Sequence, residues 1–212
     1  FSFYTHKPQQ VSGVDTPATK FSTARAFQLL DSIAQKPHAV GMPAHQEVQD
    51  FIVTTLEGYG LEVELQSDFA YKPGWGALSR AENIITRIPG TGKGETLLVM
   101  THYDSAPHTA SKGASDAGSG VVTILESIRA FLAKSEKQKN DIILLFTDAE
   151  ELGLNGASVF VNKHPWAKEV DLALNFEARG SGGSSNMIVE TNGGNGELIK
   201  AFAEANPSHP FA

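Results

Sequence analysis

Apolar positions near the start of the chain recur at the spacing of two amphipathic helices. Within residues 21–35 the apolar side chains at this spacing are Ala24, Phe27, Leu30 and Ile33. Ser22 stands just before them and can cap the first turn. Residues 45–60 repeat the pattern and stop near Gly58 and Gly60. We therefore expect two helices before the first strand.

The next segments read as three strands. Residues 61–70 alternate between apolar and polar side chains, and two further apolar stretches cover residues 81–90 and 95–104. The sequence "PGTGKGE" between the last two predicts a hairpin turn. A phosphate-binding loop is excluded there, because Lys93 is followed by Gly94 and the spacing is wrong.

The second half of the chain alternates helices with apolar strands. Helices are predicted at residues 116–136, 154–164 and 195–206, and strands at 141–151, 170–180 and 186–191. Buried strands that alternate with helices of this length indicate a mostly parallel sheet covered on both faces. We expect a three-layer α-β-α sandwich, and without repeats or linkers we expect residues 1–212 to be a single domain.

Composition and charge narrow the range of partners. The chain of 212 residues is 41% hydrophobic and carries a net charge of −7, so nucleic acid, whose phosphates need a basic surface, is not expected as a partner. It has no cysteine, which excludes disulfides and thiolate metal sites. No apolar run approaches the about 20 residues that cross a bilayer. Because the chain starts at Phe1 and not at Met, we expect that a leader, an anchor or other sequence preceded it.

Acidic residues and one histidine follow the predicted strands at their carboxyl ends or open the next helix. They are His102, Asp104, Asp116, Glu150, Glu151 and Glu177. Any one of them alone would be read as a cap or a turn residue. Carboxyl ends of parallel strands meet at one edge of a sheet, and one imidazole with several carboxylates suits a borderline divalent metal. The sequence therefore predicts a metal site at that edge.

Four motifs carry a resemblance to a known family: "THYDS", "GASDAGSG", "FTDAEELGLNGA" and "NFEARG". Their order and spacing resemble the co-catalytic di-zinc exopeptidases of the aminopeptidase and glutamate-carboxypeptidase type, which include the transferrin-receptor ectodomain. The resemblance covers the chain from about Phe21 to its end. "NFEARGSGG" is most similar to the membrane-anchored branch, which implies a peptidase domain outside the cytosol and a membrane anchor outside this sequence.

The resemblance implies a role for each residue of the cluster. His102 and Glu177 would bind one zinc ion, Glu151 would bind a second, and Asp116 would bridge the two. Many members of the family have Asp where this chain has Glu177, which leaves the distance between the metals open.

Two further roles are implied beside the ligands. Glu150 would be the general base that takes a proton from the attacking water. Asp104 would hydrogen-bond the second ring nitrogen of His102 and fix its tautomer.

The family also has a histidine ligand far downstream, and this chain offers only His209, which we interpret as a loop residue. We therefore expect a catalytic domain that is incomplete at its C-terminus and that holds one zinc ion or fewer firmly. Arg179 is a candidate for binding a substrate carboxylate, with a structural ion pair as the alternative. The other histidines are interpreted as surface or loop residues, with His108 a candidate for the cleft: His6, His38, His45, His108 and His164.

Three functions remain open at this stage. The leading hypothesis is a zinc aminopeptidase acting on peptides. A carboxypeptidase or a single-zinc glutaminyl cyclase would use the same fold. A non-catalytic, receptor-like ectodomain is the third hypothesis, and the presence of all six residues of the cluster argues against it.

Overall fold

A computed structural model describes residues 11–92, 94–134, 137–178 and 194–204. The chain divides into two compact units, one of residues 11–178 and the other of residues 1–10 with 179–212. All six residues of the predicted cluster belong to the first unit. Four features expected from the sequence lie outside the described residues: His6, Arg179, the strand at 186–191 and His209.

A five-stranded mixed sheet forms the middle of the first unit, in the order β1-β2-β4-β3-β5. The strands are β1 (Glu64–Lys72), β2 (Ala77–Ile88), β3 (Thr96–His102), β4 (Ile142–Thr147) and β5 (Val170–Asn175). β2 runs antiparallel to both β1 and β4. β3 runs parallel to both β4 and β5. The parallel part, β4-β3-β5, is the part that carries the predicted cluster.

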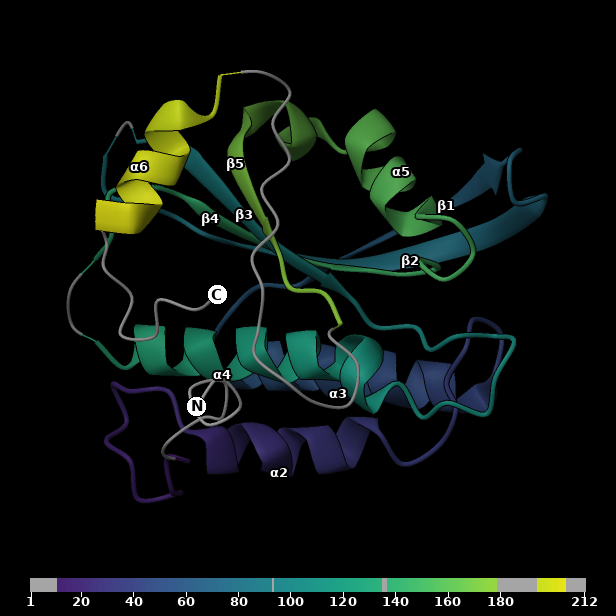
Figure 1. Ribbon diagram of the computed structural model, residues 1–212, viewed down its shortest axis with the longest axis horizontal. Helices are drawn as coiled ribbons and strands as arrows, with labels where there is room; N and C mark the ends of the chain where they lie inside the picture. The colour runs from purple at the N-terminus through teal and green to yellow at the C-terminus, as the bar shows by residue number, and fades with distance from the viewer. Residues whose placement is uncertain (1–10, 93, 135–136, 179–193, 205–212) are drawn as a thin grey trace, which may run out of the picture. The chain divides into compact units, whose positions relative to one another are not determined.

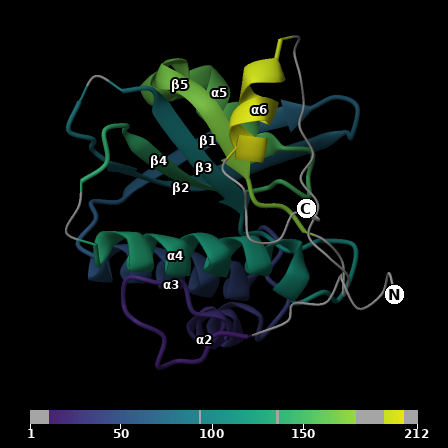
Figure 2. The same cartoon turned by 60° about the vertical axis from the view of Figure 1, so that its left-hand side comes forward.

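Helices cover both faces of this sheet (Figures 1 and 2). On one face lie α3 and α4, with α2 packed against them, and on the other lie α5 and the short 3₁₀ helix η2. Their bounds are α2 (Thr23–Ile33), α3 (Pro43–Gly58), α4 (Ser119–Leu132), α5 (Asn155–Lys163) and η2 (Pro165–Glu169). The predicted three-layer α-β-α sandwich is confirmed. Ser22 caps α2 as predicted, since its hydroxyl accepts the N–H of Arg25 at 3.2 Å.

The alternation of side chains along β4 joins the two halves of the core. Leu144 and Phe146 point toward the layer of α2, α3 and α4, whereas Ile143 and Leu145 point toward α5 and η2. All four are at most 1% exposed. Burying a side chain of this size stabilises a fold by roughly 1.5–3 kcal/mol relative to leaving it exposed. A strand that is apolar on both faces therefore takes a central place in the sheet.

The predicted hairpin between the second and third strands is wrong. β2 and β3 do not pair, because β4 lies between them as the antiparallel neighbour of one and the parallel neighbour of the other. The connecting loop instead hydrogen-bonds to the segment before β4, from the N–H of Thr91 to the carbonyl of Gln138 at 3.0 Å. The hairpin of this sheet is β1–β2, which turns within residues 73–76.

Two other expectations need correction. β5 was predicted to be a buried strand, but among the described residues it pairs with β3 alone, and Leu174 is 41% exposed. Phe27 on α2 is 58% exposed, because Ala26 and Ile33 form the buried side of that helix.

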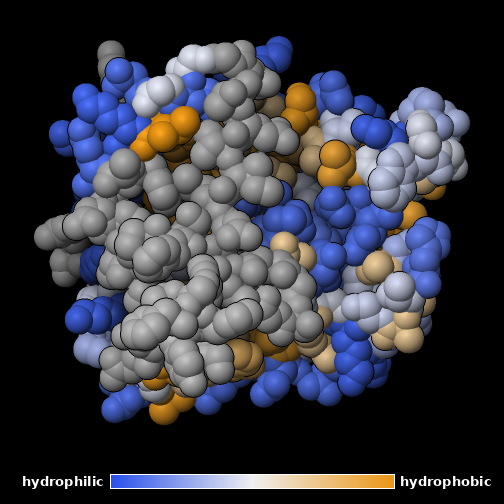
Figure 3. Space-filling view, viewed as in Figure 1, coloured by the Kyte–Doolittle hydropathy of each residue, from blue (hydrophilic) through white to orange (hydrophobic). Residues whose placement is uncertain are grey.

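The second unit contains the predicted last helix, which is present as α6 (Gly196–Glu204). Among the described residues, no helix is both long and apolar enough to cross a membrane. On the face seen in Figure 3, the described residues are mainly hydrophilic, and apolar side chains lie in small separate groups.

Candidate metal centre

The ends of three neighbouring strands bring the predicted cluster together. His102 is the last residue of β3, Glu150 lies in the turn after β4, and Glu177 lies two residues beyond β5. Asp116 comes from the segment that leads into α4. Because β4, β3 and β5 are parallel, their carboxyl ends share one edge of the sheet, where sites of α/β proteins form.

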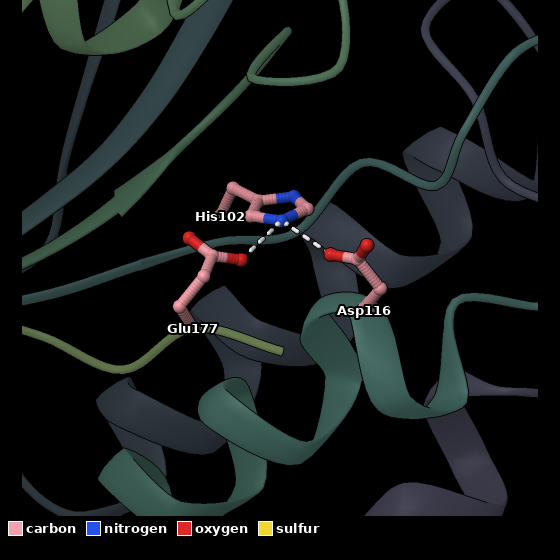
Figure 4. Close-up of side chains that lie close together, drawn as sticks. All are labelled: His102, Asp116 and Glu177. Atoms are coloured by element: carbon pink, nitrogen blue, oxygen red, sulfur yellow. Dashed lines mark hydrogen bonds and ion pairs between the residues drawn. The ribbon is translucent and has the colours of Figure 1, made fainter. Parts of the chain in front are cut away.

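Three of these side chains converge on a single point. Nε2 of His102 lies 2.9 Å from Oδ1 of Asp116 and 3.3 Å from Oε1 of Glu177. Figure 4 shows the two carboxylates approaching the same ring nitrogen from two sides. The donor atoms of the three residues all lie within 4.8 Å of one another. One imidazole nitrogen and two carboxylate oxygens are a donor set that suits zinc.

The two adjacent glutamates lie at different distances from this group. Oε2 of Glu150 is 3.8 Å from Nε2 of His102. Glu151 does not join the group of three whose donor atoms meet among the described residues. Burial raises the pKa of Glu151, and the charge of Asp116 raises it further.

The second ring nitrogen of His102 faces Asp104. Nδ1 lies 3.0 Å from the main-chain oxygen of Asp104 and 3.4 Å from its carboxylate Oδ1. Both residues are 1% exposed. Since both oxygens are acceptors, Nδ1 carries the proton, and the lone pair of a neutral His102 points to Asp116 and Glu177. This is the tautomer that a metal ligand needs.

The carboxylate of Asp104 also holds the turn after β4. Oδ1 accepts the N–H of Glu150 at 3.0 Å, and Oδ2 accepts the N–H of Glu151 at 3.2 Å. One buried carboxylate therefore links the histidine at the end of β3 to both glutamates. The contact of Asp104 with His102 was expected from the family resemblance. The hydrogen bonds from the N–H groups of Glu150 and Glu151 were not, because main-chain donors leave no pattern in the sequence.

The surroundings of His102, Glu150 and Glu177 shift the pKa values of these three groups strongly. Burial lowers the pKa of His102, but hydrogen bonds to Asp104 and Glu177 outweigh burial and raise it to about 11. The hydrogen bond from His102 lowers the pKa of Glu177 to about 2. Burial, with the charges of Glu177 and Asp104, raises the pKa of Glu150 to about 7. The cluster holds more carboxylates than one imidazolium can balance, so it attracts further positive charge.

The approach to α4 differs from the sequence expectation. The helix predicted from residue 116 begins at Ser119, and Asp116 has an extended backbone with φ −109° and ψ 100°. The peptide bond between Asp116 and Ala117 is cis. Gly113 has φ +60°, and a Cβ there would lie 2.8 Å from Cε1 of His38. This tight loop holds Asp116 out of the helix and beside His102.

Three of the histidines expected at the surface or in loops are buried: His38, His45 and His164, at 1%, 8% and 6% exposure. His38 and His164 do lie in loops, whereas His45 lies in α3, so the expectation is wrong for His45. His45 contacts Asp148, which directly precedes the turn with the two glutamates. The main chain of His38 donates to Oγ of Ser105 at 2.9 Å, so it packs beside the loop after His102. The position of His45 on the buried side of an amphipathic helix was the available sequence signal.

Comparison with known proteins identifies the family. The model of peptidase family M28 matches residues 83–210, more than half of the chain. A vacuolar membrane protease of Candida tropicalis is 32% identical over 94% of this chain and 22% of its own length. A putative endoplasmic reticulum metallopeptidase 1-A of Caenorhabditis elegans is 36% identical over 61% of this chain. The chain thus spans about a fifth of the length of the first of these relatives and 14% of the length of the second.

Solved structures share the fold. A glutaminyl cyclase of Porphyromonas gingivalis is 26% identical, with a TM-score of 0.62, over 73% of this chain and 58% of its own. A Zn-dependent exopeptidase of Parabacteroides distasonis is 22% identical, with a TM-score of 0.63, over 75% of this chain and 62% of its own. The second likeness concerns the fold alone.

Proposed function

This chain belongs to peptidase family M28, as its motifs predicted, and on that premise we propose that it is the catalytic domain of a zinc-dependent exopeptidase that removes amino-terminal residues from peptides. The observation that carries the proposal is the convergence of Asp116 and Glu177 on one nitrogen of His102, with Glu150 at 3.8 Å. A receptor-like protein without catalysis has no need for a base beside such a group.

The donor set assigns residues to the metal. His102, Asp116 and Glu177 would hold one zinc ion, and Asp116 with Glu151 would contribute to a second. When bound, zinc supplies the positive charge that lowers the pKa of a water molecule and polarises the carbonyl of a peptide bond. Asp104 keeps the proton of His102 on Nδ1, which leaves Nε2 free to bind a cation.

Glu150 is the residue that we assign as general base. Its carboxylate takes the proton of the attacking water and passes it to the amine that leaves when the peptide bond breaks. Oε2 of Glu150 lies 3.8 Å from Nε2 of His102, and the side chain of Glu150 is 27% exposed, so it remains accessible to a substrate. Burial keeps its basicity high, and general bases work best when their pKa lies near the operating pH.

A glutaminyl cyclase is the second candidate, and one observation favours it. The described residues hold a single group of three ligands, which suits one zinc ion, and a glutaminyl cyclase shares the fold at 26% identity. Such an enzyme would close an amino-terminal glutamine into a ring and release ammonia without using water.

A panel of peptides separates these functions in the full-length protein. We expect free amino acids to be released from the amino-terminus of unblocked peptides and not from N-acetylated ones. A chelator should abolish the release, and zinc should restore it. Trimming of N-acetylated peptides from the other end would indicate a carboxypeptidase, and pyroglutamate formation would indicate a cyclase. Absence of turnover on every peptide would favour a binding protein.

We also propose that residues 1–212 act as a single catalytic domain outside the cytosol, in a protein anchored to a membrane elsewhere in its sequence. The names of two relatives, a vacuolar membrane protease and an endoplasmic reticulum metallopeptidase, support this location. Protease protection of the domain in sealed vesicles from cells that express the full-length protein tests it. Digestion without detergent would contradict a lumenal site.

A further inference from the structure

The turn after β4 contains an uncommon backbone conformation at a buried residue. Ala149 has φ +53°, in the left-handed region that residues other than glycine seldom occupy, and its side chain is fully buried. It directly precedes Glu150 and Glu151. A conformation of this kind persists only where the surrounding contacts fix it. The contacts around Ala149 therefore determine where the two glutamates point.

Asp148 supplies several of these contacts. Its Oδ1 accepts the N–H of Ala149 at 2.7 Å, and its Oδ2 accepts the N–H of Glu82 on β2 at 2.9 Å. Its own N–H donates to Oδ1 of Asn83 at 3.1 Å, and its carbonyl accepts the N–H of Gly156 at 2.9 Å. Asp148 is fully buried and joins the turn to β2 and to the start of α5.

His45 is the cationic partner of this buried carboxylate. Its Nε2 lies 2.7 Å from Oδ1 of Asp148, and this is the only ion pair of Asp148 among the described residues. His45 is 8% exposed and lies in the first turn of α3. Burial lowers its pKa, but the hydrogen bond to Asp148 outweighs burial, so the pKa of His45 is raised. Across the sheet edge, α3 is thereby tied to the turn after β4.

The imidazole of His45 also contacts the segment that follows β3. Its ring stacks on the ring of Tyr103, with centroids 5.0 Å apart and planes at 24°. Tyr103 directly follows His102, and its hydroxyl donates to the carbonyl of Glu82 at 2.8 Å. His45 therefore lies between the strand end that carries the histidine and the turn that carries the two glutamates.

From these contacts we propose that His45 is a positioning residue, which acts through Asp148 to hold the Ala149 turn and so to aim Glu150 and Glu151 at the metal centre. The inference rests on the function proposed above and adds a residue to it. A buried ion pair is weak support for stability by itself, because desolvation offsets its attraction. The effect of His45 on the orientation of Glu150 and Glu151 is a different property from its effect on stability, and it can be measured separately.

A set of variants of the full-length protein tests the role of His45. His45→Leu removes the donor and keeps much of the volume, whereas Gln in His45→Gln can place an N–H near the position of Nε2. We expect kcat to fall about 10–100-fold in His45→Leu with little change in KM, by analogy with other residues that orient a site. His45→Gln should recover part of that loss.

His164→Leu is the matched control. His164 is also buried, stacks on Phe160 with ring centroids 5.2 Å apart, and has Nε2 3.3 Å from Oε1 of Glu64. It follows the C-terminal end of α5, whereas Asp148 contacts the N-terminal end of that helix. We expect it to lower the thermal unfolding temperature and to leave kcat unchanged. An equal loss of kcat in His164→Leu, or a wild-type kcat in folded His45→Leu, would overturn the proposal.

A cobalt-loaded sample separates this inference from the proposed function. The visible absorption of bound Co²⁺ reports the geometry of its ligands and needs no substrate. We expect the spectrum to change in His45→Leu and to stay as in the wild type in His164→Leu. If the wild type cleaves no peptide, the proposed function fails and the spectra still decide the role of His45. If His45→Leu does not fold, His45→Met, which also lacks a donor, takes its place: an unchanged spectrum and kcat would overturn the proposal, and an altered spectrum would support it.

Discussion

At the scale of single residues, the chemistry of the candidate metal centre depends on one imidazole, that of His102, surrounded by carboxylates. His102 is 1% exposed and faces Asp104 on one side and Asp116 with Glu177 on the other. In the absence of a metal, the proton on Nε2 is the positive charge that these carboxylates surround. A metal ion and that proton therefore compete for the same nitrogen, and the outcome depends on pH.

Metal binding should release protons from the full-length protein. The pKa of His102 is raised to about 11, so without metal its ring is protonated at pH 7, and a metal ligand must be neutral at Nε2. Affinity should therefore rise with pH. Titration calorimetry in buffers of different ionisation enthalpy measures the protons released, and we expect about one per zinc ion at this site. Zinc affinity that does not change between pH 6 and pH 8 would contradict this account.

Glu150→Gln should separate catalysis from metal binding. The amide keeps the shape of the side chain and removes the base, so we expect kcat to fall by about 10²–10⁴-fold. Zinc content should stay near that of the wild type, since Glu150 is assigned no metal. Metal analysis and peptide kinetics on the same preparation test both points. Loss of zinc, or near-normal kcat, would mean that the roles of Glu150 and Glu151 are exchanged.

Asp104→Asn should disturb the site through the main chain. The new amide nitrogen would face the N–H of Glu150 or of Glu151, so one accepted hydrogen bond would be replaced by two opposed donors. We expect zinc affinity or kcat to fall about 10–100-fold. Asp171→Asn is the control, because Asp171 also accepts a main-chain N–H, that of Thr96 at 2.7 Å, but at the other end of β3. Equal effects of the two changes would argue against a special role for Asp104.

Whole elements show what local pattern can predict and what it cannot. The periodicity of residues 116–136 and the apolar run of residues 141–151 correctly predicted α4 and β4, because each signal lies within the element. The placement of β4 between β2 and β3 depends on pairing between segments about 50 residues apart, which neither segment encodes alone. The same limit applies to His45, whose partner Asp148 is 103 residues away.

The cluster could be predicted because it follows from topology. Parallel strands end at one edge, so His102, Glu150 and Glu177 could be brought together from the ends of apolar runs, with the family motifs supplying their roles. The conformation of the turn after β4, which carries Glu150, could not be predicted. The left-handed Ala149 and the main-chain contacts of Asp104 depend on backbone geometry, and an alanine gives no sign of a positive φ.

The close packing of α4 against the sheet gives a prediction for an element. A Cβ at Gly120 would lie 2.4 Å from the carbonyl oxygen of Phe176 and 2.4 Å from Oγ1 of Thr101. These residues directly precede Glu177 and His102. Gly120→Ala should therefore push α4 outward, lower the free energy of unfolding by about 1–3 kcal/mol and weaken zinc binding.

Gly58→Ala is the control for Gly120→Ala. Gly58 ends α3, and no atom lies within 4 Å of a Cβ built there. Alanine in a helix is favoured over glycine by roughly 0.5–1 kcal/mol, so this variant should unfold at the same or a higher urea concentration. Urea titrations of both variants give the comparison. Equal stability of Gly120→Ala and the wild type would show that α4 and the sheet can separate without cost.

At the scale of the whole molecule, the metal centre lies inside one compact unit. Every residue assigned to it falls within residues 11–178. The net charge of −7 favours the approach of cations. The two metal positions differ in their donors among the described residues. The group of His102, Asp116 and Glu177 has an imidazole, whereas Asp116 with Glu151 offers carboxylates alone.

The last prediction concerns how many zinc ions the 212-residue polypeptide binds. A catalytic zinc normally has three protein ligands, and two carboxylates without an imidazole make a weak site. We therefore expect one ion to bind firmly and a second to bind weakly, with peptidase activity absent or very low. Mass spectrometry under native conditions, together with metal analysis after dialysis, counts the ions. Glu177→Ala should remove the firm ion, whereas Glu151→Ala should leave it in place. Two firmly bound ions with full activity would mean that a residue outside the described ranges, or a second chain, completes the second position.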